Sequence, residues 1–129
     1  MAWTRKDLLT MRELEPAEIV TLVDTAASLQ EIATRDIKKV PALPGKTVVN
    51  LFYEASTRTR TSFEIAGKWL SADVINFSVT GSSAAKGESF VDTAKNIEAM
   101  SPDVVVVRHS SAGAAELLAR ELACSIVNE

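Results

Sequence analysis

The most constraining feature of the sequence is a regular alternation of short β-rich runs with stretches of helical character. The β-rich runs cover residues 47–52 (TVVNLF), 73–79 (DVINFSV), 103–107 (DVVVV) and 124–127 (CSIV). Stretches with helical periodicity separate them at residues 61–70, 88–100 and 112–123. Strands that alternate with helices of this length form parallel sheets with helices on their faces. The sequence therefore predicts an α/β fold with a parallel four-stranded sheet flanked by helices.

A further helix is expected ahead of the first strand, beginning at Pro16. Proline suits a first helical position because its missing N–H would have no partner there. Apolar residues recur at helical spacing from Ile19 to Ala33, which gives this helix one apolar face. Residues 37–46 contain prolines and a glycine and are typical of a connector. The chain has 129 residues, so we interpret residues 1–129 as a single domain.

Composition excludes several classes of function. Lys and Arg number 14 against 17 Asp and Glu, and this net charge of −3 argues against general nucleic-acid binding. No apolar run approaches the roughly 20 residues of a membrane span, and the first residues lack a signal-peptide core. The lone cysteine, Cys124, allows no intramolecular disulfide and argues against a structural zinc site. We expect a cytoplasmic protein with no metal, no membrane contact and no nucleic-acid partner.

Polar residues follow every predicted strand. In open parallel sheets, ligands bind beyond the carboxyl ends of the strands. Arg58, Lys86 and Arg108 each supply a cation after a different strand, and Asn128 follows the last one. Because the chain is acidic overall, this clustering favours an anion-binding site at the carboxyl ends of the strands.

The run from Ser56 to Thr59 is the strongest candidate at these ends. It lies between a strand and a helix, where free N–H groups and a partial positive charge attract anions. The hydroxyls of Ser56, Thr57 and Thr59 add neutral donors. Arg58 adds a forked guanidinium group that suits phosphate or carboxylate. The alternative is that the hydroxyls only cap the helix and the arginine is solvated.

The start of that helix has two readings. Thr61 and Glu64 fit a capping box, which favours a start at Thr61. A start one turn earlier, at Ser56, fits equally well. The later helix at residues 88–100 ends where Ser101 and Pro102 stop it.

Other candidate residues carry weaker signals. The segment 81–89 (GSSAAKGES) nearly matches a nucleotide P-loop, but Lys86 precedes its glycine, which reverses the required order. Arg108 directly follows four valines, so a buried strand would hold it in a fixed place. His109 could act as a general base or only as a capping residue. Cys124 begins a strand, where a small buried hydrophobe is the default.

The residues from Phe52 to Glu64, FYEASTRTRTSFE, resemble the carbamoyl phosphate signature of the aspartate and ornithine carbamoyltransferase family. Asp7–Leu9, with the helix from Pro16, resembles the family's N-terminal opening. Lys86–Ser89 resembles its mobile loop, and Val107–His109 resembles the end of its third strand. The resemblance covers essentially the whole chain. The Lys-Gly-Glu-Ser loop and the Arg-His pair favour the aspartate branch over the ornithine branch.

The resemblance implies a Rossmann-like carbamoyl phosphate-binding domain and transfer of the carbamoyl group to the amine of L-aspartate, in pyrimidine biosynthesis and without a cofactor. It implies these substrate-binding residues: Ser56, Thr57, Arg58, Thr59, Ser82, Lys86 and Arg108. It assigns a catalytic role to Arg58, Thr59, Arg108 and Lys86. The phosphate would lie on Ser56–Thr59, and Thr59 and Arg108 would reach the carbamoyl oxygen. Ser82 and Lys86 would enter the active site of a neighbouring subunit of a homotrimer, where Lys86 also meets aspartate.

Two parts of the family pattern are absent from the sequence. The family's catalytic chain has a second domain of similar size that binds aspartate, and a His-Pro-x-Gln segment follows its fourth strand. We therefore expect a chain truncated before the second domain, which binds carbamoyl phosphate but is inactive by itself. Two alternatives stay open, a catalytically silent binding or assembly module and an ornithine carbamoyltransferase.

Overall fold

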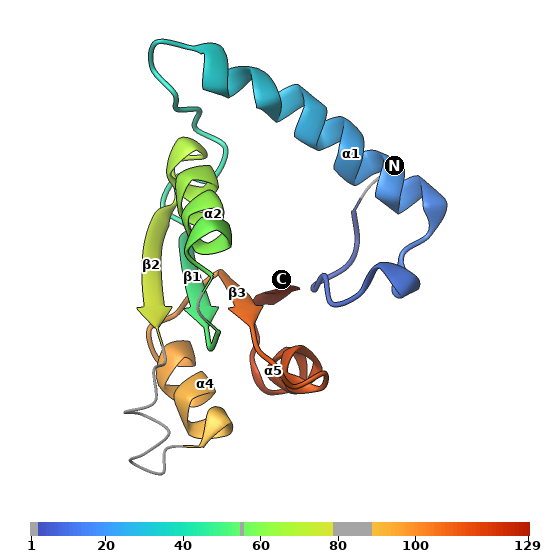
Figure 1. The fold of residues 1–129 in the computed structure, drawn as a ribbon, viewed down its shortest axis with the longest axis vertical. Coiled ribbons are helices and arrows are strands. Elements are labelled where there is room, and N and C mark those ends of the chain that lie inside the picture. Colours follow the sequence, from blue (N-terminus) through green and yellow to red (C-terminus); the bar gives the residue numbers. More distant parts are fainter. Residues whose placement is uncertain (1–2, 55, 79–88) are drawn as a thin grey trace.

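The centre of the molecule is a four-stranded parallel sheet in the order β2-β1-β3-β4 (Figure 1). The structure, a computed structural model, describes residues 3–54, 56–78 and 89–129. The strands are Thr47–Phe52 (β1), Asp73–Ser78 (β2), Val104–Arg108 (β3) and Ser125–Asn128 (β4). The predicted α/β fold with a parallel four-stranded sheet is confirmed, and each predicted strand start lies within one residue of the observed start.

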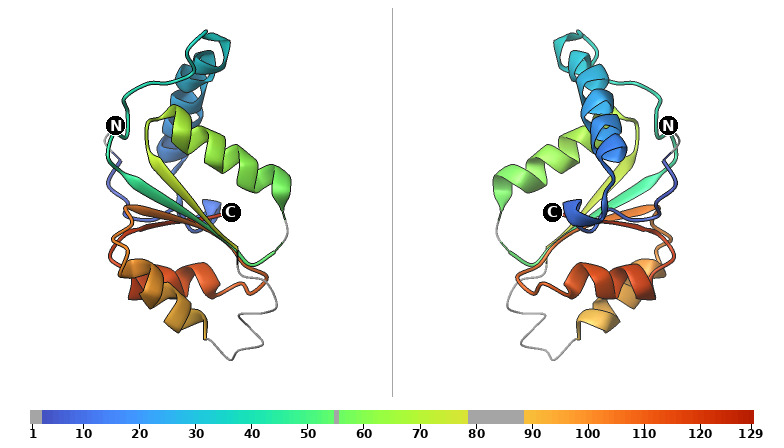
Figure 2. Two further views of the ribbon diagram at one scale, coloured as in Figure 1. Left: turned by 90° about the vertical axis from the view of Figure 1, so that its left-hand side faces the viewer. Right: turned by 90° about the vertical axis from the view of Figure 1, so that its right-hand side faces the viewer.

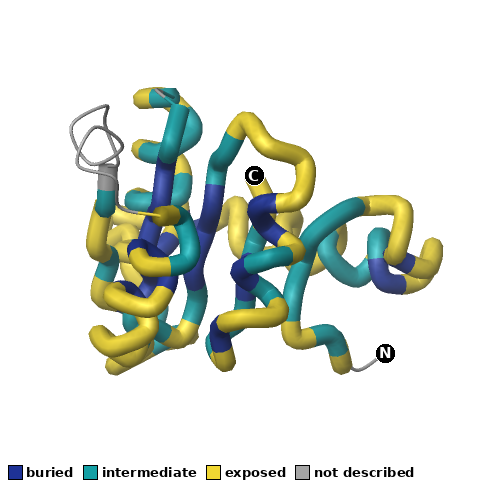
Figure 3. Tube along the Cα trace, turned by 90° about the horizontal axis from the view of Figure 1, so that it is seen from below, coloured by how far each residue is buried: buried dark blue, intermediate teal, exposed yellow. Residues whose placement is uncertain are grey.

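Helices cover both faces of the sheet (Figure 2). The helix α2 (Thr57–Trp69) lies on one face, and α4 (Phe90–Glu98) and α5 (Ala114–Glu121) lie on the other. The predicted helix at residues 112–123 is therefore shorter at both ends than expected. Burial is concentrated in the two central strands, β1 and β3, and Figure 3 shows the buried residues in dark blue along the chain. This is expected of parallel strands with helices on both faces.

Two apolar clusters form the core, one on each face of the sheet. The cluster beneath α4 and α5 includes Leu51, Ile97 and Leu118, none of which has any exposed surface. The cluster on the α2 side is smaller and contains Val48, Phe52, Ala72 and Val106. Successive side chains of a strand point to opposite faces, so β1 supplies both clusters in turn.

The start of α2 decides between the two readings of the sequence. The helix begins at Thr57 with Ser56 as its N-cap, so the earlier start is confirmed and the start at Thr61 is wrong. The N–H of Arg60 donates to the carbonyl of Ser56 at 2.9 Å and closes the first turn. Glu64 does not cap a helix, because its carboxylate accepts hydrogen bonds from Lys68 and Asn76 instead.

The helix α4 begins at Phe90. Its N-cap is Ser89, whose hydroxyl accepts from the N–H of Asp92 at 3.0 Å. The predicted start at Glu88 lies outside the described residues. Past the helix, Ser101 adopts a left-handed φ of 57°, which ends the helical path just before Pro102.

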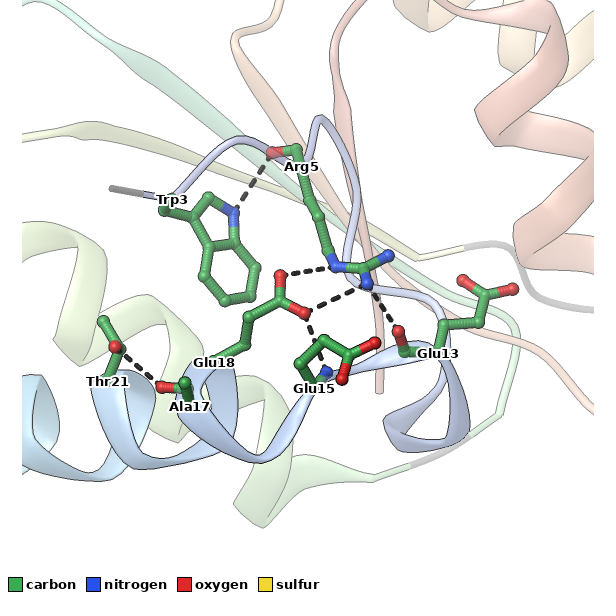
Figure 4. A network of polar contacts seen from close by, with 7 residues as sticks. All are labelled: Trp3, Arg5, Glu13, Glu15, Ala17, Glu18 and Thr21. Carbon is green, nitrogen blue, oxygen red and sulfur yellow. Dashed lines mark hydrogen bonds and ion pairs between the residues drawn. The ribbon is translucent and has the colours of Figure 1, made fainter. Parts of the chain in front are cut away.

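The helix α1 (Pro16–Gln30) begins at the predicted proline and stands apart from the sheet. Its one buried residue is Glu18, while Val23 and Leu29 on the predicted apolar face are 61% and 37% exposed. Arg5 fixes the start of α1, since its Nε lies 2.6 Å from Oε2 of Glu18 (Figure 4). The same carboxylate accepts from the N–H of Glu15 at 2.8 Å. Two short 3-10 helices flank α1, Met11–Glu13 and Glu31–Thr34.

The N-terminal segment pairs with β4. The N–H of Leu8 donates to the carbonyl of Ile126 at 2.8 Å, and the N–H of Asn128 donates to the carbonyl of Leu8 at 2.9 Å. The carboxylate of Asp7 accepts from the N–H of Ile126 at 2.9 Å. The first residues of the chain therefore cover the outer edge of the last strand.

Candidate anion site

The carboxyl ends of β1 and β3 meet in register. Phe52 lies opposite Arg108, and the N–H of Tyr53 donates to the carbonyl of Arg108 at 2.8 Å. Arg108 therefore lies beside the connection that leads from β1 to Ser56 and α2. The structure brings together two of the predicted elements of the site, Arg108 and the start of α2.

The first turn of α2 has unused donors. The backbone of Ser56 has φ −149° and ψ 75°, and its hydroxyl makes no capping hydrogen bond to the helix. Arg58 is exposed, and its guanidinium contacts no partner among the described residues by hydrogen bond or ion pair. The first N–H groups of a helix have no partner within it. The hydroxyl of Ser56, the guanidinium of Arg58 and these N–H groups are therefore placed to receive an anion.

Arg108 is held by carboxylates. Its Nε lies 3.2 Å from Oε2 of Glu54, and its Nη1 lies 2.7 Å from Oε2 of Glu129. The hydrogen bond to Glu129 and, to a smaller extent, the one to Glu54 raise the pKa of Arg108, so this side chain stays cationic. Any anion that reaches this guanidinium must compete with both carboxylates. Neither carboxylate was among the predicted site residues, although Glu54 belongs to the polar run after the first strand.

His109 lies in a cluster of rings. Its ring centroid is 4.6 Å from that of Tyr53 and 4.9 Å from that of Phe90. Its Nδ1 accepts a hydrogen bond from the N–H of Ser111 at 2.9 Å. In the described part of the chain no carboxylate hydrogen-bonds to this imidazole. The geometry supports the capping role for His109 rather than the general base.

Of the remaining candidates, Asn128 and Cys124 lie among the described residues, and neither joins the site. Ser82 and Lys86 lie outside the described residues. The side chain of Asn128 donates to the carbonyl of Leu9 at 3.0 Å, so it serves the N-terminal segment. Cys124 packs against the cluster beneath α4 and α5, and burial raises the pKa of its thiol, as expected of an unreactive cysteine.

The described residues show neither a metal cluster nor a membrane helix. Over residues 3–54, 56–78 and 89–129, His, Cys, Asp and Glu side chains form no group of three that could hold a metal ion. Among the helices of this same part, none combines the length and the apolar character that crossing a bilayer requires.

An apolar groove lies between α1 and α2, away from the polar ends of the strands. Its volume is about 550 Å³, and its lining includes Val23, Leu29, Ile32 and Trp69. Such a surface offers almost no partner to a phosphate or a carboxylate, so the groove is not part of the anion site.

Comparison with known proteins identifies the family of the chain. The model of the carbamoyl-P binding domain of the aspartate/ornithine carbamoyltransferases matches residues 6–129. An aspartate carbamoyltransferase catalytic subunit of Syntrophus aciditrophicus is 60% identical over 128 residues, which are 99% of this chain and 42% of that one.

Solved structures of aspartate transcarbamoylases share the fold of the chain. The catalytic subunit of M. jannaschii aspartate transcarbamoylase has a TM-score of 0.86 at 38% identity, over 96% of this chain and 40% of that one. The Trypanosoma cruzi aspartate transcarbamoylase in complex with carbamoyl phosphate has a TM-score of 0.84 at 31% identity, over 95% of this chain and 38% of that one. The chain thus spans 38–42% of the length of these relatives.

Proposed function

Because the chain belongs to the aspartate/ornithine carbamoyltransferase family, whose carbamoyl phosphate-binding domain it matches over residues 6–129, we propose that it forms the carbamoyl phosphate site of an aspartate carbamoyltransferase. The observation that carries the proposal is the open first turn of α2, which lies beside Arg108. The hydroxyl of Ser56 makes no capping hydrogen bond there, and Arg58 has no side-chain partner among the described residues. The 60% identity to an aspartate carbamoyltransferase catalytic subunit favours aspartate over ornithine as the acceptor. The location we propose is the cytoplasm, where a lone Cys124 stays reduced.

In the proposed site, Ser56, Thr57, Arg58 and Thr59 hold the phosphate group of carbamoyl phosphate. Arg58 contributes a charge-assisted hydrogen bond, and the N–H groups of α2 add their partial positive charge. Thr59 and Arg108 hold the carbamoyl oxygen. When the substrate binds, the carbamoyl oxygen replaces the carboxylates of Glu54 and Glu129 as the hydrogen-bond partner of the Arg108 guanidinium.

The proposed reaction joins the amine nitrogen of L-aspartate to the carbonyl carbon of carbamoyl phosphate. The C–N bond forms, the C–O bond to phosphate breaks, and phosphate leaves with the electron pair while the amine loses a proton. Negative charge grows on the carbonyl oxygen and on the leaving phosphate. Fixed cations and N–H donors stabilise that charge without reorganising, and the site also holds the two reactants in place. Phosphate is a good leaving group, so the reaction as proposed uses no cofactor.

The proposal assigns Ser82 and Lys86 to the active site of a neighbouring subunit in a homotrimer, and it assigns aspartate to a second domain together with Lys86. One test uses Lys86→Ala and Arg58→Ala chains, each extended by an aspartate domain. Each variant alone should be nearly inactive, and mixed trimers should recover activity because some sites receive both original side chains. A mixture that stays inactive despite subunit exchange would rule out the shared site.

The direct test uses the chain of 129 residues by itself. Calorimetric titration with carbamoyl phosphate should give binding, and a product assay with aspartate should give no turnover. Absence of binding would refute the proposed site. The same product assay on a chain extended by its second domain, with ornithine in place of aspartate, tests the other branch of the family. Binding without turnover by the extended chain would instead favour a silent binding or assembly module.

A further inference from the structure

A chain of side-chain hydrogen bonds runs from the middle of the sheet to α2. Asn50 lies in β1 opposite Asn76 of β2, and its Nδ2 donates to Oδ1 of Asn76 at 3.0 Å. Nδ2 of Asn76 donates to Oε1 of Glu64 at 2.7 Å. Nζ of Lys68 donates to Oε2 of the same carboxylate at 2.7 Å. We call the first three residues, Asn50, Asn76 and Glu64, the asparagine ladder.

The negative charge of Glu64 fixes the direction in which the residues of the ladder donate their hydrogen bonds. A carboxylate only accepts hydrogen bonds, so Asn76 must present its NH₂ group to Glu64. The carbonyl oxygen of Asn76 then faces Asn50, which must present its own NH₂ group. Hydrogen bonds from Lys68 and Asn76 lower the pKa of Glu64, so the carboxylate is ionised at neutral pH.

The direction leaves one atom of the ladder unsatisfied. Asn50 is fully buried, and its Oδ1 has no hydrogen-bond partner among the residues that the structure describes. A buried polar group without a partner lowers stability, so an apolar residue in the run TVVNLF would suit the core better. This unfavourable arrangement calls for a role other than stability.

The packing of α2 indicates what that role is. Gly67 is the one residue of the helix that is buried, and a Cβ atom built there would lie 2.6 Å from Cγ2 of Val74. A glycine contact brings the helix close to the sheet, but it offers no side chain that prevents the helix from turning about its axis. Phe63 is only half-buried against the cluster on this face. The ladder therefore supplies a directional link where apolar packing is thin.

We infer that the asparagine ladder is a positioning device for the anion site, an inference that rests on the proposed function. By holding Glu64 against the sheet, it sets the rotation of α2 and so the direction of its first turn. Glu64 lies five residues after Thr59, about 7.5 Å along the helix axis, so a rotation at Glu64 is carried directly to Ser56–Thr59. Asn50, Asn76 and Glu64 are thus positioning residues that touch no substrate.

A charge exchange within the ladder tests the inference. Asn76→Asp places two carboxylates at hydrogen-bond distance, and carbamoyl phosphate affinity should fall about five- to tenfold. The double variant Asn76→Asp/Glu64→Gln restores a single carboxylate, which accepts from Asn50 and from the new amide at position 64. Its affinity should return to within about twofold of the original. Calorimetry measures these affinities at a temperature where circular dichroism shows every variant to be folded.

A second measurement needs no ligand. The backbone amide resonances of Thr57–Arg60 in ¹H–¹⁵N spectra should move in Asn76→Asp and return in the double variant. Ile97→Val is the matched control, because it makes a small cavity on the opposite face of the sheet and should change neither resonances nor affinity. If Asn76→Asp does not fold, Glu64→Gln alone serves, since its amide no longer dictates the direction of the ladder.

The outcomes separate the two proposals. Unmoved resonances in the folded single variants, or a double variant that stays weak, would overturn the positioning role. A chain that binds no carbamoyl phosphate would overturn the proposed function, while the resonances would still decide whether the ladder sets the first turn of α2.

Discussion

At the scale of single residues, Arg58 and Arg108 both lie at the carboxyl ends of the strands but differ in burial and in ion pairing. Arg108 is half-buried and paired with Glu54 and Glu129. Arg58 is exposed and has no side-chain partner among the described residues. An unpaired surface side chain contributes little to folding, so Arg58 should matter for binding and not for stability.

Arg58→Ala should weaken carbamoyl phosphate binding about tenfold or more, because a charge-assisted hydrogen bond contributes roughly 1.5–3 kcal/mol. The melting temperature should change little. Titration calorimetry and thermal unfolding measure the two effects. Arg35→Ala is the matched control, since Arg35 is exposed and paired with Glu31 beyond the end of α1. Equal affinities for Arg58→Ala and the original chain would contradict the assignment.

Glu18 should make the stability of the chain depend on acidity. The hydrogen bond from Arg5 and the one from the backbone of Glu15 lower the pKa of Glu18. A carboxyl with a lowered folded-state pKa adds stability above its ordinary value, about 4.3, and loses it as the pH falls through the lower one. The free energy of unfolding in urea should therefore differ less between pH 7 and pH 3 for Glu18→Gln than for the original chain. Arg5→Met should reduce the difference in the same way, and unchanged differences would contradict the role of this pair.

At the scale of elements, the close approach of α2 to β2 depends on Gly67. Alanine is the better helix former by about 1 kcal/mol, so Gly67→Ala would be stabilising in an isolated helix. Here the added methyl would meet Val74 at 2.6 Å, and overpacking costs about 1–3 kcal/mol. We expect a net loss of unfolding free energy in urea titrations, partly recovered by Gly67→Ala/Val74→Ala. A more stable single variant would show that α2 can shift freely.

The strands were predictable from the sequence because burial on both faces leaves apolar runs such as DVVVV. Helix ends were less predictable, since Thr61 and Glu64 imitate a cap although Glu64 serves Asn76. That Arg108 would lie close to the connection leading into α2 followed from the topology, because both lie at the carboxyl ends of the strands. Its carboxylate partners did not, because Glu54 and Glu129 lie 54 and 21 residues away in the chain. The pairing of Asn50 with Asn76 could not be predicted without the register of β1 against β2. The fourth residue of both runs is an asparagine, which was a signal for this pairing.

At the scale of the whole molecule, α1 and the groove beside it leave apolar surface open. Val23 is 61% exposed and lines the groove with Trp69. We expect the isolated chain to associate at tens of micromolar, and Val23→Glu should shift it toward the monomer. Thr25→Glu, on the opposite side of α1, should have no such effect. Analytical ultracentrifugation makes the measurement, and a strictly monomeric original chain would contradict the expectation.

The pairing of the first residues with the last strand has a consequence for synthesis on the ribosome. Asp7 and Ile126, which share a hydrogen bond, are separated by 119 positions. At 5–20 residues per second, Asp7 is made roughly 6–24 s before its partner. Over that interval β1 and β2 can already pair, whereas Leu8 and its neighbours have no strand to join. Asp7, Leu8 and Leu9 are therefore among the last residues to acquire their native contacts, and nascent chains stalled before β4 should be cut by proteases near residues 7–10.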